Sequence, residues 1–288
     1  MAPIYPFIKW AGGKRQILKY LIANIPLKFE CYYEPFLGGG ALFFKLRSMG
    51  KIKQAVISDS NKDLINCYLV IRDEVDALIS RLDYYQKYVG DKNFFYDVAR
   101  KLFNKIKLNT GLEKNVEKAA LFIYLNKTCF NGLYRVNSKG EFNVPWGGHE
   151  NSLLYDYKNL ISVSKALKNS DEIKIKCCDY REAVKSAQAG DFIYFDPPYQ
   201  ATFAQYTADS FSEEDQKILA ETFRELDKRG CMVMLSNSKS SLIEYLYKDY
   251  ISKGQFAVVM APRVISCLGN ERGKTPEYII YNYCSPKS

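Results

Sequence analysis

Short apolar runs and amphipathic helical patterns alternate near both ends of the chain. Runs within 31–36 and 54–59 predict two buried strands, and between them lie a glycine turn and a helical segment that stops at Gly50. This strand–helix–strand order is typical of a parallel sheet covered by helices. An amphipathic helix is also expected before the first strand, with Ile17, Leu21 and Ile25 on one side.

The same α/β pattern returns after about Tyr157. We expect strands within 173–180, 191–195 and 231–237, with a helix from Ser212 to Lys228 before the last of them. Two final apolar runs, within 255–261 and 277–283, predict a closing pair of strands. The fold class is therefore α/β, with a mostly parallel sheet and an antiparallel closing strand pair.

The middle of the chain has a different pattern. Apolar residues recur at helical spacing from about Asp63 to Asn126, and the stretch that follows is rich in Gly, Asn and Pro. Within that stretch, "YRVNSKGEFNV" has the pattern of a hairpin. We therefore expect one α/β domain, formed by 1–62 and 158–288, that is interrupted by a helical, loop-bearing insert at 63–157.

Composition narrows the class of protein. Hydrophobic residues make up 47% of the 288 residues, which excludes a disordered or fibrous chain. No apolar run is long enough to cross a membrane and the N-terminus does not resemble a signal peptide, so we expect a cytoplasmic protein. The eight cysteines form no CxxC pair and His149 is the single histidine, so we expect reduced thiols and no metal site. A net charge of +9 suits a polyanionic partner but does not require one.

Two glycine turns are candidate binding sites. In "EPFLGGGALFF" the turn joins a predicted strand to a helix, and Asp59 lies 21 residues after Gly38 at the end of the next strand. That spacing suits a carboxylate that binds ribose hydroxyls, although a tight turn without a ligand is the alternative. In "FIKWAGGKR" the helix start and Lys14 could hold a carboxylate while Trp10 covers an apolar group; an ordinary surface helix is the alternative here.

A third motif, Asp196-Pro197-Pro198-Tyr199, follows the predicted strand 191–195. The prolines have no N–H to donate and end the strand, so a carboxylate, free carbonyls and an aromatic ring are presented at its carboxyl end. The exocyclic amine of a nucleobase fits this group, because a carboxylate and a carbonyl can each accept one N–H bond and the ring can stack on the base. A structural Pro-Pro turn explains the acid and the ring less well.

These motifs occur in an order that resembles the Dam-like DNA adenine-N6 methyltransferases, of the alpha group and D12 class. The resemblance rests on "FIKWAGGKR", "YYEPFLGGGALF", "ISDSN", "LNKTCFNGLYRVNSKGEFNVPWG" and "DFIYFDPPY" and covers nearly the whole chain. It implies a Rossmann-like methyltransferase sheet with a target-recognition insert, S-adenosylmethionine as cofactor and double-stranded DNA as partner. It also implies methylation of a flipped adenine, within GATC. Whether a cognate restriction endonuclease acts on the same sites stays open.

The resemblance also implies roles for individual residues. Transfer would involve Asp196, Pro197, Pro198 and Tyr199. The cofactor would be held by Trp10, Ala11, Gly12, Gly13, Lys14, Glu34, Pro35, Phe36, Gly38, Gly40, Asp59, Asp179, Tyr180 and Asp196. In the recognition loop, Arg135 would read a guanine and Lys9, Leu133 and Pro145 would contact base edges. Phe130 and Asn131 would fill the space left by the extruded adenine, and Gly132 beside them would also belong to the DNA-binding set.

The same motifs allow other functions. Methylation of cytosine N4 needs the same two acceptors as methylation of adenine N6. A DNA-binding relative without catalytic activity would share the motifs. A dehydrogenase that uses a dinucleotide is disfavoured, because Phe43 stands where the dinucleotide fingerprint requires a small residue. Arg135 could also be a solvated hairpin residue or a phosphate contact.

Overall fold

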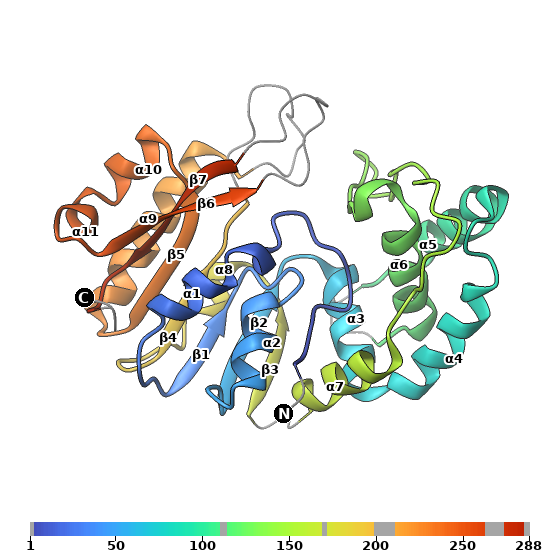
Figure 1. Cartoon of the computed structure of the whole chain (residues 1–288), viewed down its shortest axis with the longest axis horizontal. Coiled ribbons are helices and arrows are strands. Elements are labelled where there is room, and N and C mark those ends of the chain that lie inside the picture. The colour runs from blue at the N-terminus through green and yellow to red at the C-terminus, as the bar shows by residue number, and fades with distance from the viewer. Residues whose placement is uncertain (1–2, 110–113, 169–171, 199–210, 263–273, 285–288) are drawn as a thin grey trace. The chain divides into compact units, whose positions relative to one another are not determined.

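The computed structural model describes residues 3–109, 114–168, 172–198, 211–262 and 274–284 (Figure 1). Its seven strands are hydrogen-bonded in the order β3-β2-β1-β4-β5-β7-β6. They are β1 (Cys31–Glu34), β2 (Gln54–Asp59), β3 (Ile173–Cys177), β4 (Phe192–Phe195), β5 (Met232–Ser238), β6 (Phe256–Pro262) and β7 (Lys274–Tyr281). Each of these strands lies within or beside a segment where the sequence predicts one.

Strand pairing confirms the expected mixed sheet. β1 pairs in parallel with β2 and with β4, and β4 pairs in parallel with β5. β7 runs antiparallel to both β5 and β6, which makes it the antiparallel part predicted at the C-terminal end. The carboxyl ends of β1 and β4 therefore meet at the same edge of the sheet, as parallel pairing requires.

Helices fill the connections between the strands. Short 3-10 turns lie at η1 (Lys14–Gln16) and η3 (Phe130–Gly132), and a π-helical turn, η2, spans Phe94–Ala99. The α-helices are α1 (Leu18–Asn24), α2 (Ala41–Ser48), α3 (Lys62–Asp73), α4 (Val75–Gln86), α5 (Arg100–Lys105), α6 (Val116–Thr128), α7 (Tyr157–Leu167), α8 (Tyr180–Ala183), α9 (Glu213–Lys228), α10 (Ser241–Leu246) and α11 (Lys248–Ser252).

Side-chain caps fix where several helices begin. Asn61, Asn115 and Asp156 each accept a backbone N–H bond at the first turn of α3, α6 and α7. Ser212 and Asp215 form a reciprocal capping box at the start of α9, so the helix begins where the sequence predicts it. The helix expected after Gly13 is interrupted, because the 3-10 turn η1 precedes α1.

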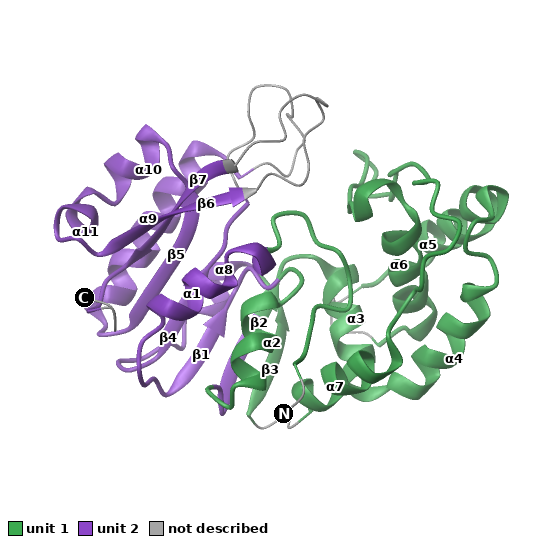
Figure 2. Ribbon diagram, viewed as in Figure 1, with its two compact units in different colours: residues 1–13, 38–51, 58–178 green, residues 14–37, 52–57, 179–288 purple. Residues whose placement is uncertain are grey.

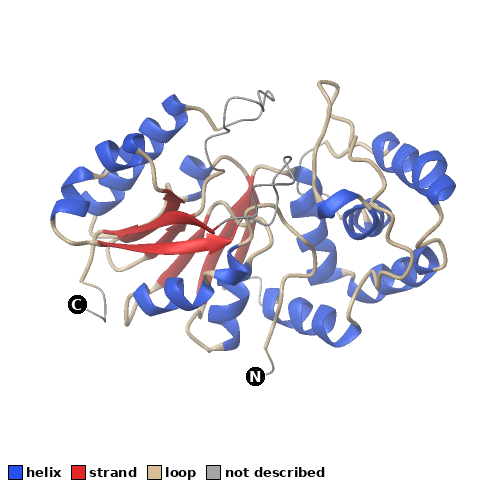
Figure 3. Ribbon diagram, turned by 45° about the horizontal axis from the view of Figure 1, so that its top comes forward, coloured by secondary structure: helices blue, strands red, loops and turns tan. Residues whose placement is uncertain are grey.

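The chain divides into two compact units (Figure 2). Unit 1 comprises 1–13, 38–51 and 58–178, and unit 2 comprises 14–37, 52–57 and 179–288. The predicted recognition segment, 63–157, lies wholly within unit 1, and most of it is helical (Figure 3). The expected α/β domain, 1–62 and 158–288, contributes residues to both units.

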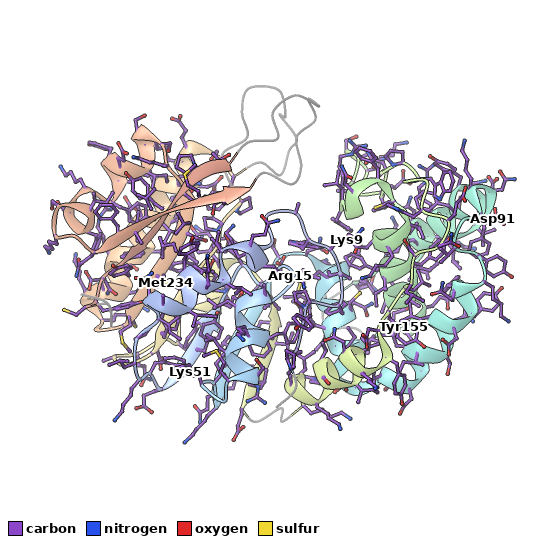
Figure 4. The ribbon with its side chains drawn as sticks, viewed as in Figure 1. Lys9, Arg15, Lys51, Asp91, Tyr155 and Met234 are labelled. Carbon is purple, nitrogen blue, oxygen red and sulfur yellow. The ribbon has the colours of Figure 1, made fainter. Side chains whose placement is uncertain are left out.

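Unit 2 has a core on one face of its strands. Ile193 and Phe195 of β4 and Val233 and Leu235 of β5 pack with apolar residues of α9, α10 and α11. Met234, which lies between Val233 and Leu235 on β5, is fully buried as well. Arg15 of η1, in contrast, is exposed; both residues are labelled in Figure 4. This packing fixes the carboxyl end of β4, at which the Asp-Pro-Pro sequence begins.

The predicted hairpin is present in unit 1 but forms little strand structure. An isolated bridge joins Val136 to Phe142, and the tip is closed by a backbone bond from the Asn137 N–H to the Glu141 carbonyl. The side chain of Asn104 on α5 accepts a bond from the Phe142 N–H and donates one to its carbonyl. A second backbone bond, from the Asn143 N–H to the Arg135 carbonyl, lies on the other side of this bridge, so Asn104 binds the Phe142 groups that point away from the partner strand.

Candidate active site

Asp196 follows directly after β4, whose four residues are all buried. Pro197 is buried and Pro198 is exposed, and neither can donate to a neighbouring strand. The carboxylate therefore stands at the carboxyl end of a central parallel strand. Tyr199, the last residue of this motif, lies outside the described residues.

One oxygen of Asp196 carries all of its described polar contacts. Lys14 Nζ lies 2.7 Å from Oδ1, and Ser236 Oγ donates to the same oxygen at 3.0 Å. The exposed fractions of the Lys14 and Asp196 side chains are 7% and 17%. Among the described residues, none donates a hydrogen bond or ion pair to Oδ2 of Asp196.

The surroundings of Asp196 have opposing effects on its charge. Burial raises the pKa of the Asp196 carboxyl above its ordinary value, while the Lys14 ammonium and the Ser236 hydroxyl lower it. Beneath the carboxylate, the hydroxyls of Tyr194 and Ser236 lie 2.8 Å apart in the core. A carboxylate that is held by a cation and a hydroxyl on one oxygen is a strong acceptor through the other.

Several predicted cofactor residues of unit 2 also lie around the strand ends. Glu34, at the end of β1, is buried and accepts a 2.8 Å bond from the Tyr32 hydroxyl, and Pro35 beside it is buried too. The rings of Phe36 and Tyr180 stack with centroids 5.1 Å apart. Asp179 caps α8 by accepting from the Arg181 backbone N–H, and it also forms an ion pair with the Arg181 guanidinium.

In unit 1, Asp59 is tied to the glycine turn. Its Oδ2 accepts the Gly38 N–H at 2.9 Å and its Oδ1 accepts the Asn61 N–H at 3.0 Å. Burial raises the pKa of the Asp59 carboxyl, and these backbone bonds oppose the rise. The Gly38 carbonyl accepts a bond from the buried Tyr68 hydroxyl, so both polar groups of Gly38 are fixed.

Trp10 packs directly against this turn. A Cβ atom at Gly38 would lie 2.6 Å from Cδ1 of Trp10, and Gly38 has a φ of +48°. Glycine is therefore required here both by the backbone conformation and by the indole ring. The next residues, Ala11 to Gly13, form an exposed turn closed by a bond from the Gly13 N–H to the Trp10 carbonyl. Gly40 also has a positive φ, +67°, at the start of α2.

The N-terminal segment and the recognition loop are joined through one buried amide in unit 1. Asn126 accepts the Lys9 N–H and donates to the carbonyls of Lys9 and Gly132, all within 2.9 Å. A Cβ atom at Gly132 would lie 2.7 Å from Cβ of Lys9. Lys9 and Gly132, which the sequence assigns to the same interface, are thus in contact; Lys9 is labelled in Figure 4.

The loop presents further predicted residues at its surface. The Phe130 N–H bonds to the Pro145 carbonyl at 2.9 Å, and the Phe130 ring is 52% exposed. Asn131 has a φ of +55°, the left-handed conformation that non-glycine residues seldom adopt. Leu133, which follows the turn, is partly buried.

Arg135 is exposed and its guanidinium is oriented by Asn143 across the hairpin. Nε donates to Asn143 Oδ1 at 2.7 Å and one Nη donates to the Asn143 carbonyl at 3.4 Å. These two bonds use one side of the fork. The end that carries both Nη atoms is the part suited to a bidentate contact with a base.

An open cavity of about 470 Å³ lies in unit 1 between α5 and the hairpin. Arg100, Lys101 and Lys105 line it on the helix side, and the hairpin side includes Asn137 and Asn143. These helix cations were not predicted as site residues, although three basic residues within "RKLFNK" are a visible signal in the sequence. Three basic side chains against one acidic side chain, Glu141, give this cavity a net positive lining, which suits an anionic group.

Comparison with known proteins decides the family. A model of the D12 class N6 adenine-specific DNA methyltransferases matches residues 10–259. The chain is 43% identical over 283 residues to a Type II methyltransferase of Lactococcus lactis subsp. cremoris, with 96% of this chain and 95% of the relative covered. A Type II methyltransferase of Methanocaldococcus jannaschii is also 43% identical, over 297 residues that cover 97% of this chain and 99% of the relative. The chain belongs to the D12 class.

A more distant relative is a DNA adenine methylase. The chain is 29% identical over 282 residues to a DNA adenine methylase of Haemophilus influenzae, with 95% of this chain and 92% of the relative covered. This D12-class protein is a DNA methyltransferase specific for adenine, as the sequence resemblance implies, and DNA is its substrate.

The described part of this methyltransferase can be inspected for disulfide bonds, metal sites and membrane-spanning helices. Its described cysteines are free thiols, of which Cys67, Cys129 and Cys231 are buried. The residues placed by the structure include no group of three or more His, Cys, Asp or Glu side chains arranged to hold a metal ion. Within the same described ranges, no helix has both the length and the apolar character needed to cross a membrane.

Three residues with visible roles in these sites were missed by sequence reasoning. They are Ser236, Asn126 and Asn143, each of which bonds to a predicted site residue; for Ser236 and Asn126 that residue is far away in the chain. Ser236 and Asn126 had one signal in the sequence, namely a polar residue inside an apolar segment, which needs a buried partner. That signal does not identify the partner.

Proposed function

We propose that this D12-class enzyme transfers a methyl group from S-adenosylmethionine to N6 of an adenine that is flipped out of double-stranded DNA, within GATC. One observation supports the proposal above the others. Asp196 is held on Oδ1 by Lys14 and Ser236, at the end of β4 and directly before two prolines. A fixed carboxylate followed by a carbonyl suits an exocyclic amine with two N–H groups.

The residues present fit the cofactor. In unit 1, Asp59 uses one lone pair on each oxygen for a backbone N–H, which leaves acceptor capacity for ribose hydroxyls. Gly38 and Gly40 provide a turn without side chains, which a ligand can approach closely. In unit 2, Glu34, Phe36, Asp179 and Tyr180 supply carboxylates and aromatic faces of the kind that bind an adenosine group. When bound, S-adenosylmethionine supplies an electrophilic methyl group.

The protein's own contribution to transfer is to prepare the amine. Asp196 accepts one N–H bond of adenine N6 and the Pro197 carbonyl accepts the other. These bonds favour a pyramidal nitrogen whose lone pair is no longer delocalised into the ring, so that it can attack. Tyr199 stacks on the base, and Pro198 keeps the segment from rejoining the sheet. Transfer would be direct, with no covalent bond to the enzyme: the bond from N6 to the methyl group would form as the bond from sulfur to that methyl group breaks. The thioether would leave, and N6 would give up one proton to solvent.

Target recognition is assigned to the segment 63–157. Arg135, oriented by Asn143, reads a guanine through O6 and N7. Lys9, Leu133 and Pro145 contact base edges, and Phe130, Asn131 and Gly132 occupy the space left by the extruded adenine. The cavity lined by Arg100, Lys101 and Lys105 holds a backbone phosphate, which positions the duplex without reading its sequence.

The test is methylation of plasmid DNA, followed by sequencing of modified positions and mass spectrometry of the nucleosides. We expect N6-methyladenine within GATC; N4-methylcytosine, or N6-methyladenine spread over unrelated sites, would contradict the proposal. Asp196→Ala should lower the rate of methylation by about 100-fold or more, because it removes a charged acceptor from the transition state. Asp196→Asn, which keeps the shape of the side chain, should lose a similar amount.

A matched control separates chemistry from stability. Asp76 is an exposed aspartate on α4, so Asp76→Ala should keep the wild-type rate. Circular dichroism and urea unfolding establish that each variant is folded. Near-wild-type turnover by a folded Asp196 variant would remove the central assignment.

A further inference from the structure

Ser236 lies in the middle of β5 and is fully buried, yet it is polar. Its hydroxyl lies 3.0 Å from Oδ1 of Asp196 and 2.8 Å from the Tyr194 hydroxyl. β5 pairs with β4 in parallel register, with Phe195 opposite Leu235. The residues that follow them, Asp196 and Ser236, therefore lie side by side. The contact between Ser236 and Asp196 therefore follows from the sheet itself.

The two hydrogen bonds of Ser236 have a fixed direction. A serine hydroxyl has one proton, and the carboxylate can only accept, so this proton points to Asp196. The bond between the two hydroxyls must then be donated by Tyr194. Burial raises the pKa of Tyr194 well above its ordinary value, so its phenol keeps the proton that this arrangement needs.

We infer that Ser236 is a positioning residue for methyl transfer, which together with Lys14 holds Oδ1 of Asp196 and leaves Oδ2 to accept the amine of the target base. This inference rests on the proposed function. Two donors on one oxygen fix the rotation of the carboxylate, whereas Lys14 alone, at the end of a flexible side chain, would fix it less. Ser236 contacts no reacting atom in this scheme and acts only through Asp196.

The same bond has a consequence for pH dependence. Asp196 is contacted by Lys14 from η1 and Ser236 from β5, and its charge acts on the phenols of Tyr194 from β4 and Tyr32 from β1. Both phenols are neutral because burial raises the pKa of each. Without Ser236, one of the groups that lower the pKa of Asp196 is lost. The pKa then rises further, and the acidic limb of the rate moves to higher pH.

The experiment compares Ser236→Ala with the wild-type enzyme in steady-state and single-turnover methylation across pH. We expect kcat to fall by about 10- to 100-fold, as for loss of one hydrogen bond to a charged group. We also expect the acidic limb to move to higher pH, with the S-adenosylmethionine Kd at neutral pH and the KM for DNA unchanged. Ser236→Thr retains the hydroxyl and should restore the position of the acidic limb.

The matched control is Ser164→Ala. Ser164 on α7 is also a buried serine, but its hydroxyl has no hydrogen-bond partner among the described residues, so this variant should keep the wild-type kcat and pH profile. If Ser236→Ala does not fold, Tyr194→Phe replaces it. That variant removes the donor to Ser236, and we expect a several-fold lower kcat and a smaller shift of the acidic limb in the same direction.

Two outcomes would overturn the inference. One is a folded Ser236→Ala enzyme with wild-type kcat and an unmoved acidic limb. The other is a loss confined to KM or to thermal stability, which would mean that Ser236 serves packing alone. Asp196→Ala is measured in parallel. If it is inactive while Ser236→Ala is unaffected, only this inference fails; if it is active, the proposed chemistry fails with it.

Discussion

Two partly or mostly buried carboxylates carry much of the proposed chemistry, and their partners differ. Asp196 is paired with the Lys14 ammonium, whereas Asp59 is held by the backbone N–H groups of Gly38 and Asn61. Burial raises the pKa of both carboxyls. Backbone dipoles compensate for burial less completely than a full positive charge, so Asp59 should be sensitive to acid.

We predict that S-adenosylmethionine binding weakens as Asp59 takes up a proton, at a pH above the ordinary carboxylate range of about 4. The effect on stability has the opposite sign. A carboxyl whose pKa is raised by folding binds its proton more tightly in the folded state, so its contribution to the free energy of unfolding is largest at low pH and is lost as pH rises through the folded-state pKa. Calorimetric titration of the cofactor from about pH 4 to pH 7 measures the first effect and urea unfolding the second.

The control for this prediction is Asp59→Asn, which cannot take up the proton. It should bind the cofactor about tenfold or more weakly at neutral pH, because an amide replaces a charged acceptor. Its remaining affinity should vary less with pH than that of the wild-type enzyme, with the residual change belonging to groups such as Asp196. Equal acid sensitivity in both proteins would assign the titration to another residue.

Residue types at the sites were largely predictable, and their supporting partners were not. Asp196, Asp59 and Gly38 belong to contiguous motifs whose chemistry can be read from neighbouring letters. Ser236 and Asn126 act on residues 40 and 117 positions away, as with Ser236 to Asp196 and Asn126 to Lys9. Such contacts depend on strand register and helix packing, which periodicity does not specify.

Among the elements, the turn between β1 and α2 gives the sharpest test. Gly38 and Gly50 both have positive φ, +48° and +68°, but only at Gly38 would a Cβ atom meet the Trp10 ring, at 2.6 Å; at Gly50 the space is open. We predict that Gly50→Ala costs about 1 kcal/mol of backbone strain alone. Gly38→Ala should cost more and should weaken S-adenosylmethionine binding by more than about tenfold, because Trp10 has to move.

Urea unfolding and cofactor titration of the two glycine variants separate strain from contact. The difference between them removes the shared penalty for positive φ and leaves the effect of the indole ring. If Gly38→Ala binds cofactor as tightly as Gly50→Ala does, the close approach of Trp10 is unimportant for the site. Wild-type thermal stability in both variants would contradict the assumed strain as well.

Elements with a strong local pattern were predicted, and elements defined by packing were not. β4 and β5 are apolar runs between turn residues, and α9 begins at a capping box. In contrast, α10 and α11 have six and five residues, too few for a clear helical period. The hairpin was predicted from its turn residues, and it pairs through one bridge, between Val136 and Phe142, with a backbone bond on either side.

For the whole molecule, a net charge of +9 alone did not identify a nucleic-acid partner. The structure localises part of that charge. Arg100, Lys101 and Lys105 gather at a cavity beside the hairpin, and Arg135 lies on the hairpin itself. Within unit 1 there are therefore two kinds of basic residue, one suited to phosphates and one suited to a base edge.

These two kinds should differ in how they affect DNA methylation. Arg135→Ala removes a bidentate contact to guanine and should cost about 1–3 kcal/mol of discrimination at that base pair, so that sites with a substituted guanine approach the cognate rate. Lys105→Ala should weaken all sequences alike and reduce the slope of log affinity against log salt by about 0.9, the value for one phosphate contact. Each variant is the charge-matched control for the other, and Lys165→Ala, an exposed lysine on α7 that does not line the cavity, controls for net charge. Rates on GATC and its single-base variants, with binding at several salt concentrations, decide the matter. A uniform loss in Arg135→Ala with cognate preference intact would show that this arginine holds a phosphate.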